Sequence, residues 1–186
     1  MSILITDFTT PDSSQEICNY LYKNLSPILK RNRPIIFLCI GSDRSTGDAL
    51  GPLIGHNLRA LKTNNIYIYG SLETPVHAKN LSSFIEKINS TFLNPYIVAI
   101  DASLGEFKTL GKIFIEKKPL FPGLALKKDI PPIGNMSITG IVNISGNFEF
   151  MILQNTRLSF VMKLADCISQ GISKFIIMSN KKLNLK

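Results

Sequence analysis

The sequence has few cysteines and no long apolar run. Its three cysteines, Cys18, Cys39 and Cys167, form no Cys-x-x-Cys pair, so we expect free buried thiols in a reducing compartment rather than a disulfide framework. No apolar stretch reaches the roughly 18 residues that a membrane span needs. The N-terminus contains acids and lacks the basic start of a secretory signal. These absences predict a cytoplasmic protein without a membrane partner.

Signatures of two common enzyme classes are also absent. The glycines around residues 41–51 do not match G-x-G-x-x-G, and no lysine stands where a phosphate-binding loop requires one. There is no G-x-S-x-G nucleophile elbow, and neither His56 nor His77 has a signature partner. Nucleotide binding and a serine triad are therefore disfavoured.

The charge is strongly basic, with 21 Lys and Arg against 13 Asp and Glu and a net charge of +8. The lysines are scattered, and only residues 181–186 are locally dense. We favour a lysine-rich solubilising surface, and direct nucleic-acid binding is not expected. The alternative is attraction to an acidic protein or to a substrate that is itself bound to DNA.

The length of 186 residues and the hydrophobic content of 45% fit one globular domain over the whole chain. Apolar runs alternate with segments of helical periodicity. Strands are predicted at residues 35–40, 66–70, 96–100, 111–117 and 136–144, with a further short one at 175–178. Helices are predicted from Ser13 or Ser14 to just before Pro27, and at residues 48–62, 78–92 and 155–173. This alternation predicts a three-layer α/β/α sandwich with a mixed, mostly parallel sheet.

Some segments depart from this pattern. Residues 1–12 are expected to be flexible, and residues 181–186 to form a basic tail. Residues 121–134, rich in proline and glycine, are expected to be an irregular excursion. Polarity alternates along residues 112–117, which favours an edge or antiparallel position in the sheet.

The most informative segment runs from Ile35 to Asn57, where an apolar strand ends in a polar loop and helical sequence follows. Asp48 stands at the start of that helix, where ligands and catalytic groups gather in open α/β sheets. Gly41, Gly47 and Gly51 indicate close backbone packing or the approach of a substrate. The structural alternative is that Thr46 or Asp48 serves only as a helix cap.

Asp101 ends a second apolar run and is expected at the same edge of the sheet. Its structural alternative is a loop cap that receives the amides of Ser103 and Leu104. Two carboxyl groups close together cannot both ionise freely, so one holds a proton while the other stays a base. Acid–base hydrolysis of an amide needs both roles. Asp48 and Asp101 are therefore the predicted catalytic pair.

Further polar residues follow the same strands. Those predicted to bind substrate are Asp43, Arg44, Glu73, His77, Asn135 and Ser137, with Thr139 beside them. Four roles stay open for His77: orienting substrate, moving a proton, binding a metal, or none of these as an ordinary loop residue. His56 is predicted to be a surface or packing residue. No cofactor is predicted; the less favoured alternative is a divalent-metal site built from Asp48, Asp101 and His77.

Three motifs, GSDRSTGDALGPLIG, GSLETPVHAKNL and IVAIDASLG, resemble the YyaC family of sporulation proteins from spore-forming Firmicutes. The resemblance covers residues 34–173. That family is similar to the germination protease Gpr, which degrades small acid-soluble spore proteins. Residues 48–52 match an Asp-Ala-Leu-Gly-Pro stretch of Gpr, and Asp101 with Ala102 matches its strand-ending Asp-Ala. A more distant similarity is to hydrogenase maturation endopeptidases of the phosphorylase/hydrolase-like fold.

The resemblance implies a sporulation-associated endopeptidase in the cytoplasm of the forespore. Its catalytic residues would be Asp48 and Asp101, and its substrates spore proteins, including DNA-associated small acid-soluble ones. Arg44 would anchor a substrate carboxylate. The chain departs from its relatives because it is far shorter than Gpr and because residues 134–140 lack the histidine with which hydrogenase maturation proteases bind nickel. Two alternatives stay open: a non-catalytic peptide-binding or regulatory sporulation protein, and a metal-dependent hydrolase.

Overall fold

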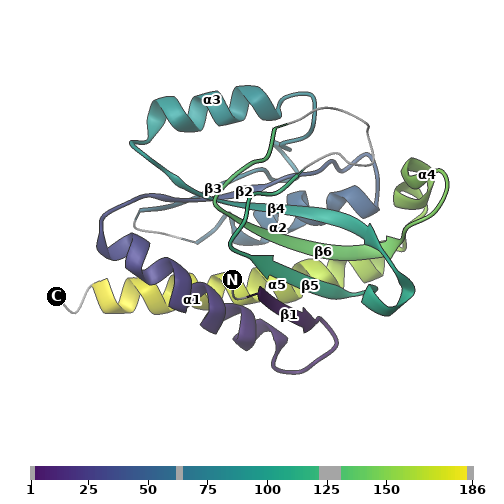
Figure 1. The fold of residues 1–186 in the computed structure, drawn as a ribbon, viewed down its shortest axis with the longest axis horizontal. Coiled ribbons are helices and arrows are strands. Elements are labelled where there is room, and N and C mark those ends of the chain that lie inside the picture. Colours follow the sequence, from purple (N-terminus) through teal and green to yellow (C-terminus); the bar gives the residue numbers. More distant parts are fainter. Residues whose placement is uncertain (1–2, 62–64, 122–130, 184–186) are drawn as a thin grey trace.

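The computed structural model describes residues 3–61, 65–121 and 131–183. Within them, six strands form one mixed sheet with helices on both faces (Figure 1). The α/β sandwich predicted from the alternation of strands and helices is confirmed. In chain order the elements are β1 (Ile3–Asp7), α1 (Ser13–Lys30), β2 (Ile35–Cys39), the 3-10 turn η1 (Gly47–Ala49), α2 (Leu50–Leu58), β3 (Ile66–Tyr69), α3 (Leu81–Thr91), β4 (Tyr96–Gly105), the 3-10 turn η2 (Phe107–Thr109), β5 (Lys112–Glu116), β6 (Met136–Ile144), α4 (Glu149–Gln154) and α5 (Leu158–Leu183).

The strand order in the sheet is β1-β5-β6-β4-β2-β3. Strands β6, β4, β2 and β3 are parallel, whereas β5 is antiparallel to both of its neighbours. All five residues of β2 are buried, because helices cover both faces of the central strands. The carboxyl ends of the parallel strands therefore meet at one edge of the sheet, on the right in Figure 1.

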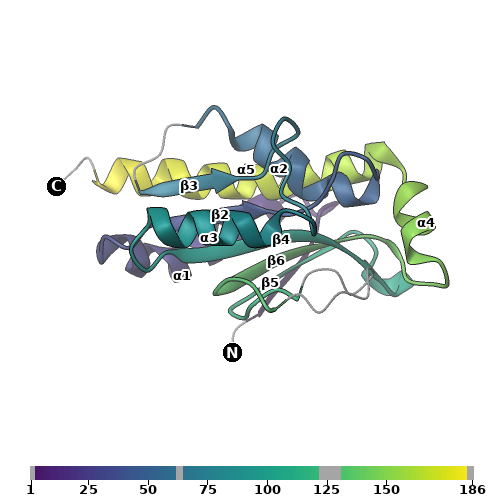
Figure 2. The same cartoon turned by 90° about the horizontal axis from the view of Figure 1, so that it is seen from above.

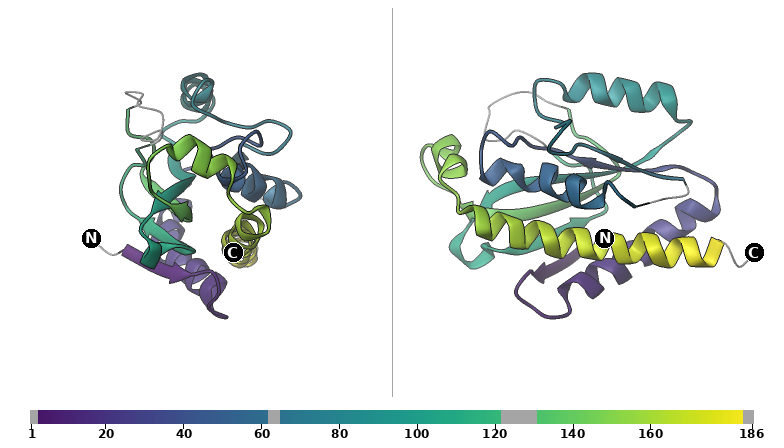
Figure 3. Two further views of the ribbon diagram at one scale, coloured as in Figure 1. Left: turned by 90° about the vertical axis from the view of Figure 1, so that its right-hand side faces the viewer. Right: turned by 180° about the vertical axis from the view of Figure 1, so that it is seen from behind.

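The helices lie on opposite faces of the sheet, with α1, α2 and α5 on one side and α3 on the other (Figures 2 and 3). Strand β4 supplies apolar side chains to both faces. Val98 and Ile100 belong to the larger core beneath α1, α2 and α5, while Ile97 and Ala99 belong to the smaller core beneath α3. Because side chains alternate along a strand, Asp101 continues the α3 face.

Residues 1–12, which were predicted to be flexible, contain the edge strand β1. Its five residues pair with β5, and the buried Thr6 donates a hydrogen bond from its Oγ1 to Glu16 Oε2 of α1 at 2.6 Å. Strand β5 is antiparallel, as its alternating polarity predicted, but it lies inside the sheet and not at the edge. A strand of five residues is too short for its alternation of polar and apolar side chains to be recognised in the sequence. It becomes evident only from its pairing with β5.

Two helices are longer than predicted. Helix α1 continues through Pro27 to Lys30, because Leu25 and Leu29 on either side of the proline are both held in the core. Helix α5 includes residues 175–178, which were wrongly predicted to be a strand. The buried Phe175 continues the inward-facing stripe of this helix, and a short apolar run cannot distinguish the two structures by itself.

The remaining differences are at the ends of elements and in loops. The helix predicted at 48–62 consists of η1 followed by α2, and the one predicted at 78–92 is α3. Helix α4, which lies beyond the right-hand edge of the sheet in Figure 1, was not predicted. Of the expected basic tail, residues 181–183 extend α5 and 184–186 lie outside the described residues. The expected excursion at 121–134 is largely outside them too, with Leu120 and Ile133 forming a bridge across its base. None of the described helices is long and apolar enough to span a membrane.

Helix α2 lies in backbone contact with the ends of β2 and β3. A Cβ atom on Gly51 would stand 2.0 Å from the carbonyl oxygen of Ile40, and one on Gly55 would stand 1.7 Å from that of Gly70. Both distances are far inside van der Waals contact, so a side chain at either position would push the helix away. This confirms the close backbone packing that the glycines predicted, and it holds η1 against the carboxyl end of β2.

Replacing Gly51 with Ala should lower the free energy of unfolding by about 1–3 kcal/mol, because the added methyl group overpacks the contact with Ile40. Urea denaturation measures the change. The control is Gly146→Ala, whose added carbon would meet only the end of the Ile152 side chain at 3.3 Å, and it should stay within about 0.5 kcal/mol of wild type. Equal stability of the Gly51 variant and wild type would contradict the backbone contact.

Candidate functional site

Asp48 lies in η1, after the carboxyl end of β2 and directly before α2. The Ser42 N–H donates to the backbone carbonyl oxygen of Asp48 at 3.0 Å, which closes the loop onto the turn. Neither η1 nor α2 has a side-chain hydrogen bond capping its amino end. The interpretation of Asp48 as only a helix cap is therefore wrong.

Asp101 lies inside β4, which continues to Gly105 alongside β6 and does not end at the aspartate as predicted. Its register partner in β6 is Thr139. The carboxyl Oδ1 accepts a hydrogen bond from the Ala102 N–H at 2.8 Å. The group therefore does not cap a loop through the amides of Ser103 and Leu104, as the structural alternative expected. The carboxyl group is surrounded by protein, yet part of the residue stays accessible to solvent.

The two carboxyl groups lie close enough to change each other's ionisation. Burial and then repulsion from Asp48 raise the pKa of Asp101 well above its usual range, and the Ala102 N–H opposes the rise. Burial also raises the pKa of Asp48, but a backbone hydrogen bond from Ser42 and the nearby charge of His77 oppose this. Asp101 is therefore the group that keeps a proton, and Asp48 ionises more readily.

His77 is held near Asp48 by a short extension of the sheet. Val76 forms a parallel bridge with Ile40, and the Gly41 N–H donates to the Val76 carbonyl oxygen at 2.8 Å. This pairing continues β2 toward η1 and sets the next residue, His77, beside the site. The structure thus brings three predicted residues together: the two aspartates and this histidine.

Asn80 is a positioning residue that the sequence analysis missed. Its Oδ1 accepts a hydrogen bond from the His77 N–H at 2.8 Å, and its Nδ2 donates to the Pro75 carbonyl oxygen at 3.0 Å. The Lys79 N–H donates to His77 Nδ1 at 3.3 Å, a further contact that orients the ring. An asparagine that closes a turn on nearby backbone is a signal that the sequence did contain.

Glu73 makes its contacts on the α2 side of the same loop. Its Oε1 lies 3.1 Å from His56 Nδ1, and the Ser71 hydroxyl donates to its Oε2 at 2.9 Å. The Glu73 backbone N–H and that hydroxyl lower the pKa of the Glu73 carboxyl group. His56, expected to be a surface or packing residue, is half-buried and joins α2 to the loop through this contact with Glu73. Substrate binding by Glu73 stays a prediction.

Asn135 and Ser137 are not brought to the aspartates. Asn135 lies at the amino ends of β4 and β6, where its Oδ1 accepts the Ile97 N–H at 2.9 Å. It precedes Thr139, the partner of Asp101, by four residues, or about 13 Å along the strand. Ser137 is only 2% exposed. Their residue types suggested a polar site, but their register puts one at the opposite edge and the other inside the sheet.

Asp43 and Arg44 lie on the exposed turn that joins β2 to η1. The Arg44 N–H donates to Ser42 Oγ at 3.2 Å, which shapes the turn. Within residues 3–61, 65–121 and 131–183, neither side chain takes part in an ion pair. Both are thus placed near Asp48 in the chain, and their contact with a substrate stays a prediction.

The donor set does not fit a resident metal ion. In the described part of the chain, no three His, Cys, Asp or Glu side chains converge as metal ligands would. Asp48, Asp101 and His77 interact electrostatically without forming such a cluster. We therefore derive no catalytic step through a metal.

Fold and site together define an α/β sandwich protein with a pair of carboxyl groups at the carboxyl edge of its sheet. Residues 6–171 match the family described as "Protein of unknown function (DUF1256)", and the chain belongs to this family. It is 45% identical over 141 residues to "Uncharacterized protein YyaC" from Bacillus subtilis (strain 168), covering 76% of this chain and 69% of that protein. The resemblance to the YyaC family is confirmed.

The fold is similar to the crystal structure of a [NiFe] hydrogenase maturation protease, HycI, from Thermococcus kodakarensis KOD1. The TM-score is 0.56 with 18% sequence identity, covering 82% of this chain and 98% of that one. At this level of identity the similarity concerns the fold alone. It agrees with the distant relation that the motifs indicated.

Replacing Asp101 with Asn should raise stability near neutral pH. The pKa of Asp101 is higher in the folded protein than the usual value of about 3.9 for the unfolded chain. Its contribution to stability is therefore complete below about pH 4 and is lost as the pH rises through the raised pKa. The Asn variant has no such loss and should be about 1 kcal/mol more stable at pH 7. Urea unfolding at several pH values between 4 and 8 measures the difference.

The control is Asp12→Asn, which changes an exposed aspartate before α1 and should follow the wild-type curve. Parallel curves for wild type and Asp101→Asn would mean that Asp101 is not the carboxyl group that keeps the proton.

Proposed function

We propose that this protein is an endopeptidase that hydrolyses peptide bonds with the Asp48–Asp101 carboxyl pair. The observation that carries the proposal is the unequal environment of two neighbouring carboxyl groups at the carboxyl edge of the sheet. Hydrolysis of an amide by acid–base catalysis needs one group that is protonated and one that is ionised. The fold shared with a maturation protease is compatible with this function, but fold alone does not imply it.

In the proposed mechanism, the Asp48 carboxylate accepts a proton from a water molecule while the water oxygen attacks the carbonyl carbon of the peptide bond. Asp101 then donates its proton to the amide nitrogen as the carbon–nitrogen bond breaks. The products are a new carboxyl terminus and a new amino terminus. Transfer of a proton from Asp48 to Asp101 restores the starting state. The charge of His77 favours the ionised form of Asp48 and so supports its role as base.

We propose spore proteins as the substrates, in the cytoplasm of the forespore, with DNA-associated small acid-soluble proteins among them. The support is the similarity of residues 48–52 and of Asp101–Ala102 to the motifs of the germination protease Gpr. Arg44, on its exposed turn, is suited to anchor a substrate carboxylate by a two-pronged hydrogen bond.

The second candidate function is a non-catalytic peptide-binding or regulatory sporulation protein. It is favoured by exposed apolar side chains at the same edge of the molecule, among them Phe148 and Met151 of the α4 segment. A protein that binds spore peptides but never cleaves them would support this candidate over the first.

Asp48→Asn and Asp101→Asn should each lower the rate of cleavage by at least about 100-fold, because each removes one proton-transfer group. The assay is incubation of a spore-protein extract with each protein, followed by mass spectrometry of the peptides formed. Circular dichroism checks that the variants remain folded, and Asp12→Asn should cleave as wild type does. Identical peptide profiles for wild type and the double Asn variant would argue against a peptidase.

The pH dependence of kcat/KM should be bell-shaped. The rate falls at high pH as Asp101 loses its proton, and since the pKa of Asp101 is raised, this limb lies above the usual range of an aspartate. The rate falls at low pH as Asp48 gains a proton. His77→Gln removes a charge that lowers the pKa of Asp48, so it should move the acid limb to higher pH and leave the alkaline limb in place. An unmoved acid limb would exclude this role of His77.

A further inference from the structure

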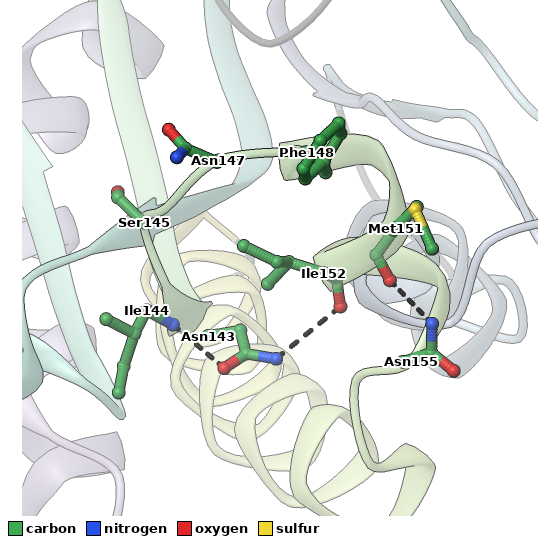
Figure 4. A pocket seen from close by; sticks show the side chains of 8 residues that line it. All are labelled: Asn143, Ile144, Ser145, Asn147, Phe148, Met151, Ile152 and Asn155. Atoms are coloured by element: carbon green, nitrogen blue, oxygen red, sulfur yellow. Dashed lines mark hydrogen bonds between the residues drawn. The ribbon is translucent and has the colours of Figure 1, made fainter.

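A cavity of about 570 Å³ opens beyond the carboxyl end of β6, between residues 143–148 and helix α4 (Figure 4). The eight described residues that line it are all uncharged. Figure 4 shows Ile152 reaching from α4 toward the segment that follows β6. A cavity of this size with mostly apolar walls is typical of a binding site for a small molecule or for part of a peptide.

The rim of the cavity carries apolar side chains that face water. Ile144, Phe148 and Met151 are 38%, 78% and 57% exposed. Phe148 has a φ of 65°, a left-handed backbone conformation that favours glycine or asparagine over an aromatic residue. Clustered exposed apolar residues mark binding surfaces, and here the strained backbone keeps one of them at the mouth of the cavity.

Asn143 holds the two walls of the cavity together. Its Oδ1 accepts the Ile144 N–H at 2.8 Å, while its Nδ2 lies 3.5 Å from the Ile152 carbonyl oxygen and donates to Thr156 Oγ1 at 3.1 Å. One amide side chain thus joins the end of β6 to the α4 segment (residues 148–156). These hydrogen bonds hold the two walls of the cavity in place.

The α4 segment also packs directly on the turn that carries Asp48. A Cβ atom on Gly47 would lie 2.8 Å from Leu153 Cδ2 and 3.0 Å from Thr156 Oγ1. These short distances show that η1 and the residues around α4 are in close contact. The cavity and the carboxyl pair are therefore neighbouring parts of one surface at the carboxyl edge.

The register of β6 gives the spacing between the carboxyl pair and the cavity. Thr139 pairs with Asp101, and Asn143 lies four residues further along the strand, which corresponds to about 13 Å. An extended peptide also advances about 3.3 Å per residue. A peptide whose scissile bond lies at the carboxyl pair would thus reach the cavity with a residue about four positions away.

We propose that the cavity is a subsite for an apolar side chain of an extended peptide substrate, about four residues from the bond that is cleaved. This inference rests on the proposed peptidase function and adds a preference to it. The lining has apolar surface for an apolar side chain and no charged group to attract an acidic or basic one, which favours an apolar residue there. Ser145 and Asn147 on the exposed loop add polar groups suited to the peptide backbone.

The first test measures binding without catalysis, on the Asp48→Asn/Asp101→Asn double variant. The probes are N-acetyl-leucine amide and N-acetyl-phenylalanine amide, with N-acetyl-aspartic acid amide as the charged counterpart. Methyl NMR signals of Ile144, Met151 and Ile152 should shift with the apolar probes and not with the charged one. Adding Met151→Ser or Ile144→Ser should weaken this binding about fivefold, whereas Leu93→Ser, at a residue that is 92% exposed before β4, should leave it unchanged.

The second test uses the active protein and a peptide taken from a cleaved spore protein. Met151→Ser should raise KM about tenfold with kcat nearly unchanged, and exchanging the apolar residue about four positions from the cleaved bond for aspartate should do the same. Normal kinetics in both cases, with no NMR response to the apolar probes, would overturn the subsite and leave the peptidase proposal intact.

Binding of the apolar probes by a protein that cleaves nothing would support the cavity as a peptide site and remove the peptidase. The surface around the cavity could instead bind a second copy of this chain. Sedimentation of wild type and Met151→Ser measures whether each protein is a monomer or a dimer. A dimer that Met151→Ser converts to monomer would show that this surface is an interface between copies, and the subsite proposal would fall.

Discussion

The backbone contact between α2 and the ends of β2 and β3 is the constraint on which the rest of the site depends. Gly51 and Gly55 have no side chains, so the helix lies directly on the carbonyl groups of Ile40 and Gly70. This contact determines where η1 sits, and η1 carries Asp48. With any larger residue at Gly51, the first turn of the helix would move away from the sheet, and Asp48 with it.

That placement puts two carboxyl groups near each other in a site where burial raises both of their pKa values. Asp101 continues the row of Ile97 and Ala99 on one face of β4, and Asp48 is held near it. Burial opposes the ionisation of both groups, and repulsion from Asp48 adds to this at Asp101. A backbone hydrogen bond from Ser42 and the charge of His77 favour the ionised form of Asp48. The two carboxyl groups therefore differ in how readily they ionise, and Asp101 holds its proton more strongly than Asp48 does.

Two elements flank the carboxyl pair: the loop of residues 71–80 on one side and helix α4 on the other. The loop of residues 71–80 is held by the hydrogen bonds of Asn80 and by the contact between Glu73 and His56, so it positions His77. On the other side, α4 packs on Gly47 and leaves an open cavity with an apolar rim. The carboxyl pair thus lies between a hydrogen-bonded loop that holds its histidine and an exposed apolar surface. Family membership and the shared fold are compatible with this arrangement, but the case for function comes from the residues themselves.

The sequence alone determined the class of fold and most strands and helices, and it predicted that Asp48 and Asp101 lie near each other at the carboxyl edge of the sheet. Each of these follows from local periodicity or from a polar residue next to an apolar run, which neighbouring residues reveal. Tertiary structure decided the rest. Strand β1 exists because β5 pairs with it, residues 175–178 are helical because Phe175 packs into the core, and Ser137 is buried because of its register in β6. Only the folded chain shows that Asn135 lies at the far edge, and that burial and repulsion from Asp48 raise the pKa of Asp101. These properties depend on contacts between residues far apart in the chain, and no local pattern encodes such contacts.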